Sequence, residues 1–118
     1  MSKNDWMGKF SGAVTVCDSN GTILEMNEEA TRVFASDGGA ALVGKNIFDC
    51  HHESARAKIR TIAATLVPNV YTIQKSGKKK LVYQAPWFRA DGAFAGLVEW
   101  IVTLPATVPH FDRDKPGP

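Results

Sequence analysis

Hydrophobic and polar positions alternate in two parts of the chain and follow a helical period between them. The alternating stretches are rich in valine, isoleucine and aromatic residues, which favour strands. Five strands are predicted, at residues 13–18, 22–26, 70–75, 80–88 and 94–104. The clearest turn joins the first two, because Asn20-Gly21 supplies the positive φ angles that tight hairpin turns require. The predicted order is two strands, helices and three strands.

The middle of the chain predicts two main helices. Asn27 is a suitable N-cap for the first, with Glu28 and Glu29 in its first turn, and residues 37–39 end it. Residues 40–43 predict a further short turn of helix, and residues 46–52 are expected to be irregular. A second helix begins near Ser54, buries Ile59 and Ile62 on one face and ends before Pro68.

Both ends of the chain differ from this alternating core. Trp6, Met7 and Phe10 predict a short amphipathic helix that is too short to be stable alone, so it packs either on its own domain or on a second copy. After Leu104, four prolines and few apolar residues predict an extended or mobile tail. The predicted organisation is a lead-in helix (1–12), one domain (13–104) and a proline-containing tail (105–118).

Composition narrows the functional class. A chain of 118 residues fits one domain with its own core, and a net charge of +2 gives no reason to expect direct nucleic-acid binding. No apolar run is long enough to span a membrane and no signal peptide is recognisable, so a cytoplasmic protein with no membrane partner is expected. In that compartment Cys17 and Cys50 are expected to be free thiols.

Several weak motifs share the spacing of one known family. They are Asp18-Ser-Asn-Gly-Thr-Ile-Leu-Glu-Met-Asn27, then Ala30 and Phe34, Leu42-Val-Gly-Lys45, and Asp91-Gly-Ala-Phe-Ala-Gly-Leu-Val98. Together they resemble the sensory PAS domain family, over roughly residues 13–104. The resemblance implies an α+β fold, a five-stranded antiparallel sheet with helices packed on one face. It also implies sensing, through a ligand chamber between sheet and helices or through dimer contacts.

The residues disfavour the cofactors found in some members of that family, so the cofactor is left unknown. Ile47 follows Gly44-Lys45-Asn46 where the flavin-binding branch has its reactive cysteine, and the predicted helix from residue 55 to 66 lacks the axial histidine of the haem-binding branch. Cys50, His51 and His52 are consecutive and therefore cannot readily converge on one metal ion. A third hypothesis, after the sensor and the interaction module given below, is an enzyme using Cys50, His51 and Glu99, but no partner that would orient a nucleophile is evident.

Two interpretations of the histidines stay open. One histidine packs or caps near the helix start while the other is solvated, or His51 is a hydrogen-bonding wall of the chamber.

The last predicted strand poses the sharpest question about the chamber. Leu97, Glu99 and Ile101 share one face, and the opposite face is wholly apolar. Composition alone favours a solvated Glu99. The resemblance instead turns Glu99 towards the helices and leaves Val98 and Trp100 on the outside, where a lead-in helix or a second subunit would cover them.

If Glu99 faces the helices, eight residues are predicted to contact a ligand: His51, Ile59, Ile62, Thr72, Val82, Gln84, Leu97 and Glu99. Five are predicted to form a dimer interface: Trp6, Met7, Phe10, Val98 and Trp100. No catalytic or metal-binding residue is predicted.

The resulting hypothesis is a non-enzymatic sensory module of bacterial type, acting in signal transduction or transcription regulation. Its expected partners are a small-molecule ligand, a second copy of the chain and a signalling protein. The alternative is a ligand-free dimerisation or protein-interaction module. Pro105 and Pro109 oppose a continuous signalling helix after the last strand.

Overall fold

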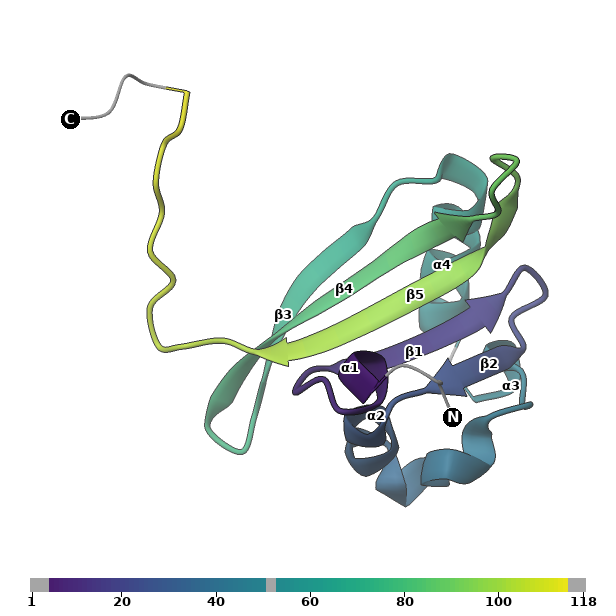
Figure 1. Cartoon of the computed structure of the whole chain (residues 1–118), viewed down its shortest axis with the longest axis horizontal. Coiled ribbons are helices and arrows are strands. Elements are labelled where there is room, and N and C mark those ends of the chain that lie inside the picture. Colours follow the sequence, from purple (N-terminus) through teal and green to yellow (C-terminus); the bar gives the residue numbers. More distant parts are fainter. Residues whose placement is uncertain (1–4, 51–52, 115–118) are drawn as a thin grey trace.

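A computed structural model of the chain describes residues 5–50 and 53–114 (Figure 1). Its centre is a five-stranded sheet in the order β2-β1-β5-β4-β3, with every neighbouring pair antiparallel. The strands are β1 (Ala13–Asp18), β2 (Ile23–Met26), β3 (Asn69–Lys75), β4 (Lys78–Phe88) and β5 (Phe94–Thr103). Because β5 lies between β1 and β4, the last strand joins the first hairpin to the later one. The predicted fold class is observed.

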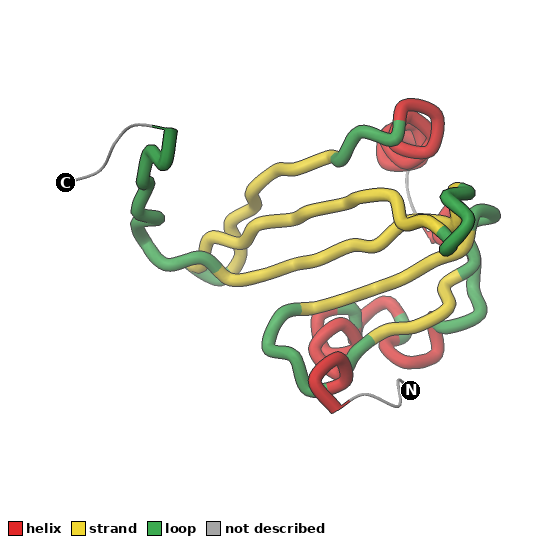
Figure 2. Tube along the Cα trace, turned by 45° about the horizontal axis from the view of Figure 1, so that its top comes forward, coloured by secondary structure: helices red, strands yellow, loops and turns green. Residues whose placement is uncertain are grey.

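Most helices cover one face of this sheet. They are α2 (Glu28–Val33), the 3₁₀ turns η1 (Ala35–Asp37) and η2 (Gly39–Leu42), α3 (Ile47–Cys50) and α4 (Glu53–Thr65). In Figure 1, α4 passes behind β4 and β5, whereas α1 (Asp5–Gly8) lies in front of β1. Figure 2 shows the helices in two places, one beyond an end of the sheet near β3 and the others beside β1 and β2. We call the face towards α4 the inner face and the opposite face the outer face.

The connection between η2 and α4 differs from the prediction. Residues 46–52 were expected to be irregular, but residues 47–50 form the helical turn α3. The Asn46 side chain explains where it begins, because its Oδ1 accepts a hydrogen bond from the Phe48 N–H at 2.9 Å. Asn46 also forms a bridge with Thr22, and its Nδ2 donates to the Asn20 carbonyl. The start of α3 is therefore fastened to the β1–β2 turn.

The register of the β3–β4 hairpin shows that one residue was predicted on the wrong face of the sheet. Thr72 was expected on the inner face with Val82, but Tyr71 pairs with Val82 and Thr72 pairs with Leu81. The Ser76-Gly77 turn sets this register, since a two-residue loop pairs Lys75 with Lys78 and so fixes every pair behind it. Directly paired residues point to the same face, so Tyr71 lies on the inner face and Thr72 on the outer.

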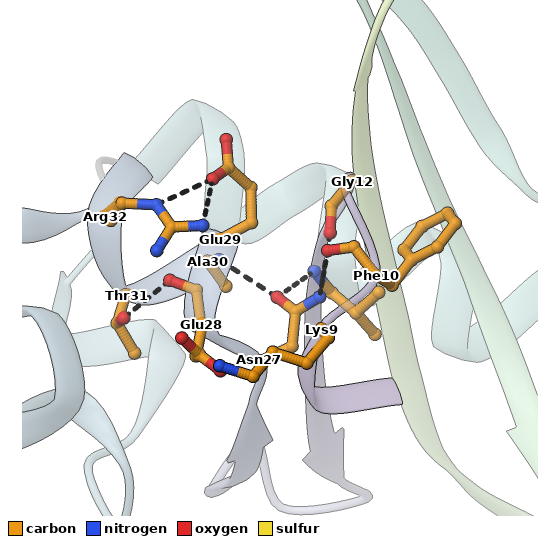
Figure 3. A network of polar contacts seen from close by, with 10 residues as sticks. Lys9, Phe10, Gly12, Asn27, Glu28, Glu29, Ala30, Thr31 and Arg32 are labelled. Carbon is orange, nitrogen blue, oxygen red and sulfur yellow. Dashed lines mark hydrogen bonds and ion pairs between the residues drawn. The ribbon is translucent and has the colours of Figure 1, made fainter. Parts of the chain in front are cut away.

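Asn27 fastens α2 to the segment that leads into β1 (Figure 3). Its Oδ1 accepts hydrogen bonds from the backbone N–H groups of Val14 and Ala30, both at 2.9 Å. Its Nδ2 donates to the carbonyl of Gly12 at 2.8 Å and to that of Phe10 at 3.5 Å. The predicted N-cap is thus confirmed. Because the side chain is buried, these bonds also satisfy an amide that would otherwise be costly to enclose.

The two ends of the described chain behave differently. Helix α1 is shorter than expected and ends at Gly8, so Phe10 lies beyond it. An ion pair of 2.8 Å between Lys9 and Glu28 holds the following segment near α2. Residues 105–114 contain no helix or strand and extend away from the sheet (Figure 1). Of the described helices, none has the length and apolar character needed to cross a membrane.

Candidate ligand chamber

A chamber of about 330 Å³ lies between the inner face of the sheet and the helical segments. That volume is within the range of small-molecule sites, which begins at about 300 Å³. The strands contribute Thr15, Cys17, Ile23, Met26, Gln84, Leu97 and Glu99, and Val98 borders the chamber although alternation places its side chain on the outer face. The remaining walls contribute Phe34, Asp37, Leu42, Ile47 and Ile59. Most of these side chains are apolar, so the chamber suits a compact and largely apolar molecule.

Polar side chains form a short hydrogen-bonded row across three strands. Asn69 on β3 donates from Nδ2 to Oε1 of Gln84 on β4, at 2.9 Å. Gln84 then donates from Nε2 to Oε2 of Glu99 on β5, at 2.8 Å. Gln84 and Glu99 are directly paired across the two strands and are both partly buried, which places the row on one face. The chamber therefore has a polar wall with a carboxyl group at its end.

Cys17 also lines the chamber, on β1, which neighbours β5 on the side away from Gln84 and Asn69. Its side chain is buried, and burial raises the pKa of its thiol. The carboxylates of Asp18 and Glu99 raise this pKa further, while a hydrogen bond with the backbone of Leu97 acts in the opposite direction. Cys17 is therefore a protonated, weakly reactive thiol near neutral pH.

A close approach of three strands supports this part of the chamber. The indole Nε1 of Trp87 on β4 donates to the Cys17 carbonyl on β1 at 2.9 Å, although β5 runs between them. Gly96 is the β5 residue at this point, with a φ of 152°, and a Cβ here would overlap the Cys17 carbonyl oxygen. The approach thus requires a glycine.

The structure brings four of the predicted ligand-binding residues together at the chamber wall: Ile59, Gln84, Leu97 and Glu99. Ile62 and Val82 are buried but do not line it, and Thr72 is on the outer face. His51 lies outside the described residues, so its predicted role is not tested. The two parities weighed for β5 are resolved, because Leu97 and Glu99 are on the chamber side.

Sequence reasoning missed several lining residues, chiefly Thr15 and Cys17 on β1 and Phe34, Leu42 and Ile47 in the helical segments. The β1 residues could have been found from alternation. Thr15 pairs with Glu99 and Cys17 with Leu97, so they share the inner face once β1 is placed beside β5. No comparable pattern identifies the helical residues, because their positions depend on how η1, η2 and α3 fold back over the sheet.

The outer face is apolar and partly exposed. Trp100 is 49% exposed and Tyr83 37%, and their ring centroids are 6.2 Å apart. The lead-in segment covers part of this face: a Cβ at Gly12 would lie 2.7 Å from the Phe10 ring and 2.8 Å from Val102. Trp6 remains 69% exposed. The predicted interface residues therefore border a surface that the chain itself leaves partly uncovered.

Among the residues that the structure describes, no group of three or more histidine, cysteine, aspartate or glutamate side chains could hold a metal ion. The side chain of Cys50 and the two histidines after it are not described. The prediction of no metal site is therefore untested at that cluster.

Comparisons with known proteins agree on the fold. A family model described as a PAS domain matches residues 7–104. A search of curated proteins found no match. A sensory box sensor histidine kinase from Vibrio cholerae is similar in structure, with a TM-score of 0.62 at 18% identity, covering 86% of this chain and 88% of that one.

Two other solved structures extend the comparison. The Aer2 receptor from Vibrio cholerae, described as a dual PAS-haem oxygen sensor, gives a TM-score of 0.61 at 20% identity, covering 80% of this chain and 96% of that one. The Vibrio cholerae VqmA–ligand–DNA complex gives 0.67 at 13% identity, covering 88% of this chain and 50% of that one. At these identities the likeness concerns the fold alone.

Proposed function

The chain belongs to the PAS domain family, and on this premise we propose that it is a non-catalytic sensory module that binds a small molecule in the chamber. PAS domains are typically sensory and signalling modules. The proposal includes the division into a lead-in segment (1–12), a PAS domain (13–104) and a tail (105–118), and a cytoplasmic location.

One observation carries the ligand proposal, the row from Asn69 through Gln84 to Glu99 at an otherwise apolar chamber. A carboxyl group is costly to enclose in apolar surroundings unless it has partners, so an ordinary core would place an aliphatic residue there. Ile101, two residues further along the same strand face, shows what such a position ordinarily contains. A ligand that uses the carboxylate gives Glu99 a function that packing does not supply.

Retention of a compound by the purified protein tests this proposal. Native mass spectrometry of freshly purified protein is expected to detect a species heavier than the bare chain by the mass of a small molecule. Absorbance of the same sample distinguishes a coloured cofactor from a colourless ligand. If only the bare chain is detected, and no small molecule added afterwards binds the chamber, the ligand-sensing proposal is wrong.

A second function is favoured by the outer face, dimerisation through a second copy of this chain. The outer-face positions Val98, Trp100 and Val102 carry no charge, so two copies can oppose them without like-charge repulsion. The predicted interface residues Trp6, Met7 and Phe10 continue this surface on the lead-in segment. Exposed aromatic pairs such as Tyr83 and Trp100 commonly supply much of the binding energy of an interface. Dimerisation can accompany ligand sensing or act alone as the ligand-free alternative.

Signal transmission to a partner protein or to transcription regulation would then involve the same dimer. The VqmA structure, which is similar in fold and is described as a complex with ligand and DNA, offers a precedent for this fold in a protein that binds both. Nothing in this proposal requires the chain itself to contact nucleic acid.

A further inference from the structure

The charged side chains that the structure describes at the chamber wall are all of one sign. Among the described residues that line it, Asp37 and Glu99 are carboxylic acids, and there is no lysine or arginine. Asp37 is exposed on η1, whereas Glu99 is partly buried on the sheet. Acidic groups at a cavity favour a positively charged or hydrogen-bond-donating occupant over an anionic one.

The hydrogen-bonded row fixes which atom type faces a ligand at Glu99. A carboxylate has no N–H to offer, so the Gln84 group next to it must be the amide Nε2, and Oε1 must face Asn69. Each donor in the row therefore points towards Glu99. Glu99 contributes only acceptor oxygens to this row, and an acceptor oxygen is the complement of a ligand N–H rather than of a ligand carboxylate.

The influence of Glu99 extends across the inner face, to the neighbouring strand β1 on one side and to β3, two strands away, on the other. Burial raises the pKa of Tyr71 on β3, and the negative charge of Glu99 raises it further. On β1, burial raises the pKa of the Cys17 thiol, and Asp18 and Glu99 add to that effect. Both shifts have the direction expected beside a negative potential.

We propose that the chamber binds a small, mostly apolar organic cation, whose protonated amine or charged nitrogen heterocycle donates a hydrogen bond to the Glu99 carboxylate. This inference rests on the proposed ligand-sensing function and specifies its ligand class. An organic cation fits better than a metal ion, because the described residues bring together no set of three ligating side chains. The apolar walls at Ile47, Ile59 and Leu97 would contact the hydrocarbon part of the ligand.

Three matched probes separate charge from shape: 2-phenylethylamine, 2-phenylethanol and 3-phenylpropionate, each titrated into the full chain by isothermal calorimetry. The amine is expected to bind roughly 10- to 100-fold more tightly than the alcohol, since a hydrogen bond to a charged group contributes that much. The carboxylate is expected to bind most weakly of the three.

Two variants test whether the preference for the amine over the alcohol comes from Glu99. Glu99→Gln keeps an acceptor oxygen for Gln84 and removes the charge, so the amine and the alcohol should bind within about threefold of each other. Glu25→Gln removes the same charge from an exposed position on the outer side of β2 and should keep the full preference for the amine. The melting temperature of each variant confirms that it is folded.

The outcomes distinguish this inference from the function beneath it. If the alcohol or the carboxylate binds as well as the amine, the ligand class is wrong and the ligand-binding chamber stands. If the amine preference survives in Glu99→Gln, the assignment to Glu99 is wrong. If none of the three probes binds and no retained compound is found, both proposals fail.

Discussion

The two faces of β5 differ in a direction that composition does not suggest. The outer face presents Val98, Trp100 and Val102, all apolar, yet Trp100 is 49% exposed. The inner face presents Leu97, Glu99 and Ile101, which include a carboxyl group, yet it packs towards the helices and the chamber. The more apolar face is thus the more accessible one.

This difference indicates that the residues on each face are not selected for stability alone. A sequence selected for packing alone would place its carboxylate outside and its tryptophan inside. Positions where a local rule is broken are commonly functional sites. On the inner face the exception is a polar wall of a chamber, and on the outer face it is an apolar surface that a second copy could cover.

The largest expected effect comes from a substitution at Gly96, where β1, β5 and β4 approach one another closely. Gly96→Ala puts a methyl group against the Cys17 carbonyl at a φ of 152°, so we expect a loss of about 4 kcal/mol or more in unfolding free energy, or no folded protein. Urea denaturation measures it.

Gly92→Ala is the matched control for that experiment. Gly92 also has a positive φ, of 90°, but a Cβ there would meet no atom within 4 Å. Its expected cost is therefore only about 1–2 kcal/mol, from the left-handed backbone alone. Equal costs at both glycines would contradict the close approach of β1, β5 and β4.

A smaller effect on the fold, but a large one on assembly, is expected at the outer face. Trp100→Glu introduces a charge into the apolar surface and should weaken dimerisation by at least about tenfold, because buried tryptophans are frequent anchors of interfaces. Sedimentation velocity at several concentrations measures the change. Val108→Glu adds the same charge at an exposed position of the tail and should leave the oligomeric state unaltered. An unchanged oligomer in Trp100→Glu would exclude this face as the dimer contact.

The smallest expected effect concerns the inner face at high pH. Burial raises the folded pKa of Cys17 above that of a free thiol. The thiol then contributes stability that is fully present below the unfolded pKa of about 8.5 and is lost as the pH rises through the folded value. Urea denaturation at about pH 7 and about pH 9.5 should show a larger loss in the native chain than in Cys17→Ala. The same loss in both proteins would mean that Cys17 is not buried as described.

The sequence allowed most of the fold to be predicted, because the signals were local. The predicted limits of β1 agree with the structure, and the N-cap at Asn27 is confirmed. Helix α3 was missed although Asn46 carries a capping side chain. A helix of four residues is little more than one turn, so it is too short to show a helical period in the sequence. The sheet face of Thr72 was predicted wrongly. The two-residue Ser76-Gly77 turn sets the pairing of β3 with β4 and could have been used to find the correct face.

The chamber was less accessible to sequence reasoning. Glu99 and Gln84 could be proposed because the resemblance to the PAS family turned these polar positions of adjacent strands towards the helices, whereas composition alone favoured a solvated Glu99. Their partner Asn69 could not, because it lies at the first position of β3, where no alternation precedes it. Phe34, Leu42 and Ile47 reach the chamber only through the tertiary arrangement of short helical turns, which no periodic pattern encodes.

The central claim is that the carboxylate-bearing face of β5 lines a chamber open to small molecules. Isoleucine-methyl NMR during titration with 2-phenylethylamine tests it most directly. Ile47 and Ile59 line the chamber, whereas Ile73 does not line it and lies opposite Lys80, near the turn of the β3–β4 hairpin. The expected result is saturable shifts of the Ile47 and Ile59 methyl signals with no shift at Ile73. Shifts confined to Ile73, or no shift at any of the three, would contradict the claim.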